Sequence, residues 1–192
     1  MAKAVPLVLG LAWEILMGVS SLGGRPIYAA APELSYQEFD QTPGNGWRTL
    51  VDNRRFAEAG RMIESYLAEQ AKLTSSEKAN LHFHAAQCFA MEGSKTDITS
   101  ALVHLRYARI HPESADSPIR WNDYVTATEA FLMSDLPLLR ASRARIASGP
   151  RLNGEVVNLD VVDRLIAKFG ESYATAYRAD RSAGRESRNG MR

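Results

Sequence analysis

Three stretches of this chain repeat one helical pattern, and this recurrence constrains the fold more than any other feature. The stretches cover residues 56–66, 81–108 and 121–146. In each of them apolar residues recur three and four positions apart, which predicts pairs of short amphipathic helices. A repeated helix-pair unit is typical of a stacked array, in which no unit buries its apolar face alone. Because such arrays bind partners and rarely catalyse reactions, the pattern favours a binding function.

Composition and charge are those of an ordinary globular protein. The chain has 192 residues, of which 45% are hydrophobic and 23% are charged, and this suits one domain with a real core. A formal net charge of +1 gives no overall attraction to nucleic acid or to acidic membranes. The single cysteine, Cys88, excludes an internal disulfide and any metal site built from several cysteines. We therefore expect a protein or peptide partner and no nucleic acid.

The first 31 residues have the layout of a secretory signal. Lys3 gives a positive start, the segment from Val5 to Gly24 is almost wholly apolar, and small residues follow up to Ala31. Cleavage after Ala29 would suit this layout, although Glu14 interrupts the apolar segment. We therefore predict that residues 1–31 are a signal peptide and that the protein is exported, with the periplasm as its location.

An uncleaved N-terminal anchor is the alternative interpretation of the same segment. Residues 5–24 would form a helix of about 30 Å, which is enough to span the bilayer at ~1.5 Å per residue. The protein would then be held at the inner membrane by these residues alone. A third interpretation is a buried amphipathic helix of a cytosolic protein.

The remaining sequence predicts an all-α domain. Residues 32–46 form an irregular lead-in, punctuated by proline and glycine, whose Tyr36 and Phe39 are expected to dock on the first helix. Helical periodicity then predicts helices at about 47–53, 56–72, 77–92, 97–110, 119–133 and 136–147, a seventh ending at 169, and a last turn at 172–177. The helical domain is thus expected to cover residues 47–177. Residues 178–192 are rich in arginine and predict a disordered basic tail.

The second, third and fourth of these predicted helices each carry a small residue on the inner face. Ala59, Ala86 and Ala101 would let neighbouring helices approach closely, where a bulky side chain would force them apart. The helix at 77–92 is apolar on most sides and is expected to lie at the centre of the array, with Gly93 ending it in a left-handed conformation.

These residues resemble a known repeat over about residues 47–147. The pattern is similar to the tetratricopeptide repeat, and it occurs twice. The first copy has the spacing of Phe56, Ala59 and Ile63. In the second copy Ala86 and Phe89 precede Gly93, and Ala101, Leu105 and Ala108 follow it. The resemblance implies antiparallel helix pairs stacked as a short α-solenoid, with a C-terminal covering helix. It also implies binding of a protein or peptide on a concave face.

Two groups of side chains are candidates for that binding. Asn122, Asp123 and Tyr124 would line a groove that reads a peptide backbone, and Arg106 and Arg109 would belong to a basic surface for acidic segments. The alternative for both groups is an ordinary solvated helix face beside core aromatic residues.

Catalytic chemistry has one weak candidate. His84 and Cys88 lie four residues apart and share a helix face, but His82 points away from them, so a zinc site would need His104 or His111 as well. No nucleophile motif or phosphate loop is present in the sequence. We therefore predict a non-catalytic protein without metal or cofactor that binds a protein or peptide in the cell envelope. The alternatives are a self-associating helical subunit and a metal-dependent enzyme using His82, His84 and Cys88.

Overall fold

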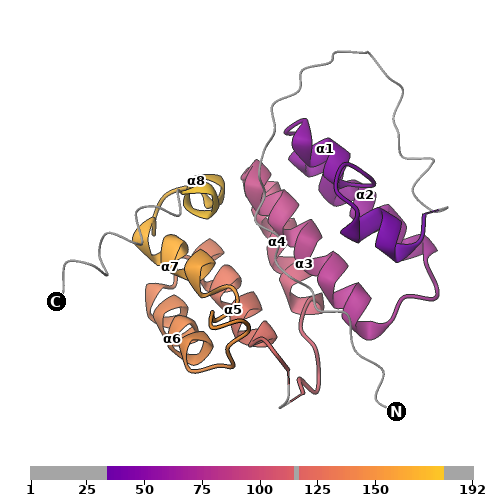
Figure 1. The fold of residues 1–192 in the computed structure, drawn as a ribbon. Coiled ribbons are helices and arrows are strands. Elements are labelled where there is room, and N and C mark those ends of the chain that lie inside the picture. The colour runs from indigo at the N-terminus through magenta and orange to yellow at the C-terminus, as the bar shows by residue number, and fades with distance from the viewer. Residues whose placement is uncertain (1–33, 115–116, 180–192) are drawn as a thin grey trace, which may run out of the picture.

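The computed structural model describes residues 34–114 and 117–179, and these residues form helices and no strands (Figure 1). The predicted leader or anchor at residues 1–31 lies outside the described residues, as does the tail beyond residue 179. The elements are η3 (Gln37–Gln41), α1 (Arg48–Asp52), α2 (Phe56–Glu69), α3 (Ser75–Glu92), α4 (Lys95–Tyr107), α5 (Trp121–Leu132), α6 (Leu136–Ala147), α7 (Leu159–Ala167) and α8 (Tyr173–Arg178). The predicted all-α class is confirmed.

Local capping explains where the central helix α3 begins and ends. The Thr74 side chain accepts a hydrogen bond from the Glu77 backbone N–H, and Glu77 accepts one from the Thr74 backbone N–H, which is a capping box. Gly93 follows the helix with a φ of 80°, a left-handed conformation that glycine adopts without strain. The predicted end at Gly93 is therefore confirmed.

Helix α5 begins two residues later than the sequence predicts. Its first two free N–H groups, those of Trp121 and Asn122, donate to the Glu113 carboxylate at 2.6 and 3.1 Å. Glu113 lies eight residues upstream in the connection after α4, so its role as a cap has no local sequence signal.

Helix α3 lies between α2 and α4, and the three form tightly packed hairpins. Its buried residues cover most of its circumference, as its apolar sequence predicts. Ala59, Ala86 and Ala101 are fully buried at the helix contacts. Gly60 of α2 approaches α3 still more closely, because a Cβ atom there would lie 2.7 Å from the Phe89 ring. Packed helix pairs are therefore a feature of this fold.

The second half of the described chain packs as a further hairpin, α5 with α6, which α7 covers. Phe83 of α3 joins the halves, since its ring lies 5.1 Å from that of Trp121 and 5.0 Å from that of Tyr124. Helix α8 returns to α3, where Gln87 donates to the Tyr173 hydroxyl at 3.4 Å. In Figure 1, α8 lies above α7 and turns toward α3 and α4. The terminal helix thus closes onto the first hairpin.

The lead-in is more ordered than its proline and glycine content predicts. It contains a π-helical turn, η3, in which Phe39 and Asp40 are buried. Phe39 stacks on Tyr66 of α2, with ring centroids 3.8 Å apart and planes 4° apart, so it docks on α2 rather than on α1. The Tyr66 hydroxyl donates to the Leu34 carbonyl at 2.9 Å and holds the start of the segment.

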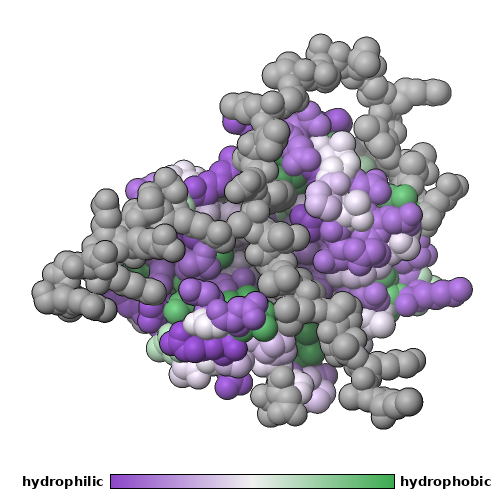
Figure 2. All heavy atoms as spheres, in the orientation of Figure 1, coloured by the Kyte–Doolittle hydropathy of each residue, from purple (hydrophilic) through white to green (hydrophobic). Residues whose placement is uncertain are grey.

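The surface is mainly polar where it is described. The face shown in Figure 2 is largely hydrophilic, with separate hydrophobic residues rather than one broad patch. Among the described residues, the large hydrophobic side chains that stand exposed are Val103, Tyr107 and Met133. No helix between residues 34 and 179, outside the two undescribed positions, has the length and apolar content to cross a bilayer.

Candidate functional site

Three interhelical turns meet at one end of the helices and line an open groove. They are the α3–α4 turn at Gly93, the α5–α6 turn at Ser134 and the α7–α8 turn at 170–172. The lining exposes polar and apolar groups in about equal measure; the lining residues are Ala90, Gly93, Ile98, Phe131, Leu132, Ser134, Gly170, Glu171, Ser172 and Tyr173. The hollow has a volume of about 160 Å³. This is below the roughly 300–1,000 Å³ of sites for small ligands, so the groove has room for one or two side chains of another chain.

Two of the turns that line the groove also carry exposed side chains. Met133 is 59% exposed and directly precedes the lining residue Ser134, whose φ of 59° turns the chain sharply. At the α7–α8 turn Glu171 forms an ion pair with Lys168 at 3.2 Å, and both side chains are largely solvated. An exposed methionine next to the α5–α6 turn suits adaptable contacts with another chain.

The predicted peptide-reading group at 122–124 is occupied by contacts within the fold. The Asn122 amide donates to the Ile110 carbonyl at 2.8 Å and accepts from the Ile110 N–H at 3.0 Å, so it fixes the chain after α4. Tyr124 is buried against Phe83 in the core. Asp123 forms an ion pair with Arg145 of α6. These side chains do not line the groove at the turns.

The two predicted arginines, Arg106 on α4 and Arg109 just after it, differ in their surroundings. Arg109 donates to the Leu105 carbonyl at 3.1 Å and forms an ion pair with Glu129 of α5, so it bridges two helices. Arg106 is exposed. Neither arginine lines the groove. Arg109 lies near Asn122, since it contacts Thr126 one turn further along α5.

A buried polar cluster around Asp40 is absent from the sequence prediction. The Asp40 carboxylate is fully buried and accepts hydrogen bonds from the Trp47 indole N–H at 3.0 Å, from His84 Nδ1 at 2.7 Å and from the Gln41 amide. Arg48 adds a hydrogen bond to the Asp40 backbone carbonyl at 2.8 Å. The only local signal is one acid among aromatic residues. Its partner His84 lies 44 residues away, and only the fold brings the two together.

The charge of Asp40 is stabilised within the cluster. Burial alone would raise its pKa, but the charge of His84 and the hydrogen bond from it, together with Arg48 and Trp47, lower the pKa below the usual range. Burial and the Asp40 charge in turn raise the pKa of the nearby Tyr36 hydroxyl. The cluster therefore fastens the lead-in segment to α3 through a charged group, and we regard it as structural.

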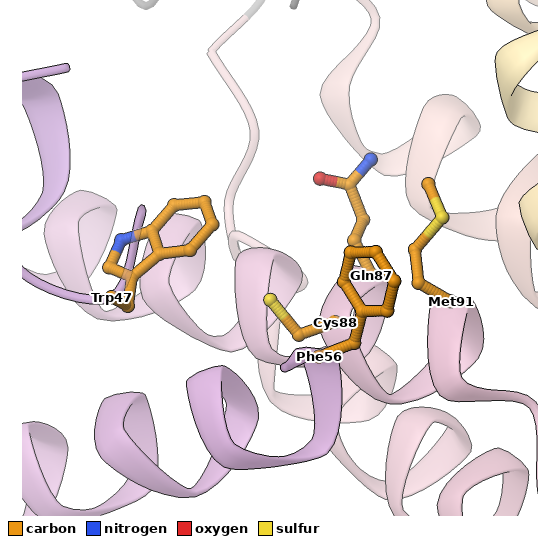
Figure 3. Close-up of a pocket in the computed structure, with 5 residues that line it drawn as sticks. All are labelled: Trp47, Phe56, Gln87, Cys88 and Met91. Atoms are coloured by element: carbon orange, nitrogen blue, oxygen red, sulfur yellow. The ribbon is translucent and has the colours of Figure 1, made fainter. Parts of the chain in front are cut away.

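Cys88 lies one turn after His84 and lines a small pocket (Figure 3). In this view its sulfur lies between the rings of Trp47 and Phe56, with Gln87 and Met91 completing the lining. The pocket has a volume of about 10 Å³, which is far below the roughly 300–1,000 Å³ of ligand sites. Burial raises the pKa of the Cys88 thiol strongly, which disfavours the thiolate that a nucleophile needs.

The histidines that would serve a metal enzyme are separated by the fold. His84 binds Asp40, whereas His82 lies 2.9 Å from His104 through their Nδ1 atoms. Within the described ranges, no group of three histidine, cysteine or acidic side chains is placed to hold a metal ion.

The chain matches no protein-family model, no curated protein and no solved structure. We therefore infer function from contacts within the molecule. The open groove at the three turns is the site that these contacts leave accessible.

Proposed function

We propose that the chain is a non-catalytic, tetratricopeptide-like helical module that binds a protein or peptide segment in the cell envelope. One observation carries the proposal: three successive hairpin turns line a single open groove whose lining combines apolar and polar side chains. Arrays of helix pairs bind extended segments on surfaces to which several units contribute. The groove thus has the arrangement that such binding requires.

The arrangement of the turns also supports the proposed stacking of helix pairs. The α3–α4, α5–α6 and α7–α8 turns all border the groove, which is what successive hairpins in one orientation would produce. The fully buried Ala59, Ala86 and Ala101 fit the close helix contacts of such a stack. Export remains a proposal from the first 31 residues, with an inner-membrane anchor as its alternative.

The proposed ligand is a peptide with one or two apolar anchor side chains flanked by groups that hydrogen-bond to the rim. Ile98 and Leu132 would receive the anchors, because they are the partly exposed aliphatic side chains of the lining. Ser134 and Ser172 would bond to the backbone of the peptide. Such pairing of an apolar pocket with a few polar groups is usual in peptide recognition.

A displayed library of random peptides, selected against the purified full chain, tests this function. The affinity of selected peptides is then measured by fluorescence anisotropy for two variants. Ser134→Arg places a long side chain in the groove, and Leu132→Asp places a charge among the apolar residues of its lining. We expect each to weaken binding at least tenfold. Val103→Asp on the outer face of α4 is the matched control and should bind as the native chain does.

Two results would count against the proposal. The first is a selection that enriches no peptide above an unrelated helical protein. The second is a set of peptides whose affinity is unchanged in Ser134→Arg while circular dichroism shows the variant to be folded. Sedimentation or light scattering at several concentrations tests the alternative role, which is self-association.

That rival role is self-association through α4. Val103 is 45% exposed and Tyr107 is 64% exposed, and the two lie four residues apart on one helix face. A second copy would cover them. If the native chain is a dimer and Val103→Asp is a monomer, self-association gains over peptide binding.

A further inference from the structure

A hydrogen-bonded row of titratable side chains, the Glu64–His104–His82 chain, joins three helices. None of its members lines the groove or takes part in the proposed function. Glu64 of α2 lies 3.0 Å from His104 Nε2 of α4, and His104 Nδ1 lies 2.9 Å from His82 Nδ1 of α3. His104 is buried, with its side chain 8% exposed, whereas Glu64 is 45% exposed. The chain therefore runs from solvent into the contact between α3 and α4.

The geometry of the two imidazoles fits a shared hydrogen rather than a metal ion. The ring centroids of His82 and His104 are 5.2 Å apart, which is the 2.9 Å between the Nδ1 atoms plus the two ring radii. Both nitrogens therefore lie on the line between the ring centres, and each lone pair points at the other. A metal ion on this line would need the nitrogens much farther apart, at about 4 Å for two bonds of ~2.0–2.1 Å.

The positions of the hydrogens in the Glu64–His104–His82 chain follow because it ends at the Glu64 carboxylate. Ionised Glu64 only accepts, so His104 Nε2 carries a hydrogen, and neutral His104 must then accept at Nδ1. His82 donates from its Nδ1 and keeps a free lone pair at Nε2. One added proton enters at His82 Nε2, the Nδ1 hydrogen shifts to His104, and the bond between the rings persists. A second proton puts a hydrogen on both Nδ1 atoms, and the bond is lost.

We propose that the Glu64–His104–His82 chain is an acid-sensitive latch between α3 and α4, closed while the two imidazoles hold at most one added proton. Opening it loosens the packing of α4 on α3. Tyr107 of α4 stacks on the His82 ring with centroids 5.2 Å apart, so the same part of α4 contacts His82 twice. Loss of the ring-to-ring bond therefore weakens the attachment of residues 103–107 to α3.

The charges around the latch set the direction of its response. Glu64 of α2 lies against His104, and Lys78 of α3 opposes a cation on His82. On α4, Tyr107 lies against His82 and Arg106 is exposed beside it in the sequence. Burial, followed by the charges of His104 and Lys78, lowers the pKa of His82 to about 4. His82 thus resists the second proton until the solution is strongly acidic.

The sign of the stability effect follows from this. An unfolded histidine takes its proton near pH 6.5, whereas folded His82 takes it only near its lowered pKa. Between these values the unfolded chain holds more protons, so acid favours unfolding. The unfolding equilibrium constant should therefore rise by up to about tenfold for each pH unit lost in this window through His82 alone.

NMR titration of the full chain with labelled histidines is the primary test. We expect the His82 signal to titrate near pH 4 in the native chain and to move toward pH 6.5 in His104→Gln, which removes the neighbouring ring. The titration of His82 in the native chain alone decides the test, so the outcome does not depend on the folding of any variant. If native His82 titrates near pH 6.5, the latch does not exist.

Hydrogen exchange supplies the conformational test. Amides at 103–107 of α4 should exchange at least tenfold faster relative to those of α2 when the pH falls from 6 to 4. His82→Gln should abolish both this change and the contribution of His82 to the pH dependence of stability, whereas His111→Gln, which alters an exposed histidine after α4, should leave both unchanged. Equal pH dependence in the native chain and in His82→Gln would overturn the proposal.

Discussion

Replacement of Asp40 tests whether a buried charge holds the N-terminal segment in place. Asp40→Ala removes the fully buried carboxylate that accepts hydrogen bonds from Trp47, His84 and Gln41. Each of these three side chains then loses that hydrogen bond. Removing one partner of a buried charged group costs about 3–5 kcal/mol. We expect the free energy of unfolding to fall by about 4 kcal/mol, or nearly a thousandfold in the equilibrium constant.

Asp40→Asn is the more discriminating variant. Its carbonyl can still accept from Trp47 and His84, because both bonds end on the same carboxylate oxygen. In the native chain the Gln41 amide donates to the second oxygen of Asp40. In the variant an NH₂ group stands at that place, so the Gln41 amide must turn over to present its oxygen. Bonds to a charged group contribute about 1 kcal/mol more than neutral ones, so we expect a loss of about 2 kcal/mol.

Urea unfolding followed by far-ultraviolet circular dichroism measures both variants. Asp52→Asn on α1 is the control, because Asp52 is exposed and its replacement should change stability by less than about 0.5 kcal/mol. Because the pKa of Asp40 is lowered, its contribution is present above the unfolded value and is lost as the pH falls below about 4. A loss below 1 kcal/mol in Asp40→Ala would show that the cluster does not fasten the segment.

Three further outcomes follow from local contacts. Gly60→Ala should lose about 1 kcal/mol in urea unfolding, since overpacking against the Phe89 ring exceeds the gain in helix propensity, and Phe89→Leu should suppress the loss in a double-mutant cycle. Thr74→Ala should lose about 1 kcal/mol through the capping box, measured in the same way, whereas Ser76→Ala should not. Cys88 should resist a thiol reagent in the folded chain at pH 8 and react in urea, because burial raises its pKa; fast reaction without denaturant would contradict this.

Helical periodicity was sufficient to predict most of the fold from the sequence. The apolar residues of α2 and α3 recur at helical spacing, and the stop at Gly93 has a local physical cause, so neither depends on distant contacts. The start of α5 was predicted two residues early, because the Glu113 cap is distant in sequence. Local patterns therefore define the helices, whereas remote side chains set some of their ends.

The polar contacts of the candidate site were not predictable in the same way. Asn122 and Asp123 are polar residues on an amphipathic helix, and the sequence alone does not show whether they face solvent or an internal partner. In the structure Asn122 bonds to Ile110 and Asp123 pairs with Arg145. The Asp40–His84 and His82–His104 contacts likewise join segments that only the packing of α3 brings together.

The closure of α8 onto α3 links the stability of the fold to the proposed binding groove. In an open array each unit contacts only its neighbours, but here Arg178 of α8 lies over the Phe56 ring of α2, 4.9 Å from its centroid. Tyr173 of the same helix both packs on Phe131 and lines the groove. A ligand in the groove would therefore bind only when α8 is docked. By mass action it would stabilise the docked state by about 2.7 kcal/mol at a free concentration one hundred times its dissociation constant. A selected peptide should accordingly slow hydrogen exchange in α8 more than in α6, and equal protection of the two helices would place its binding elsewhere.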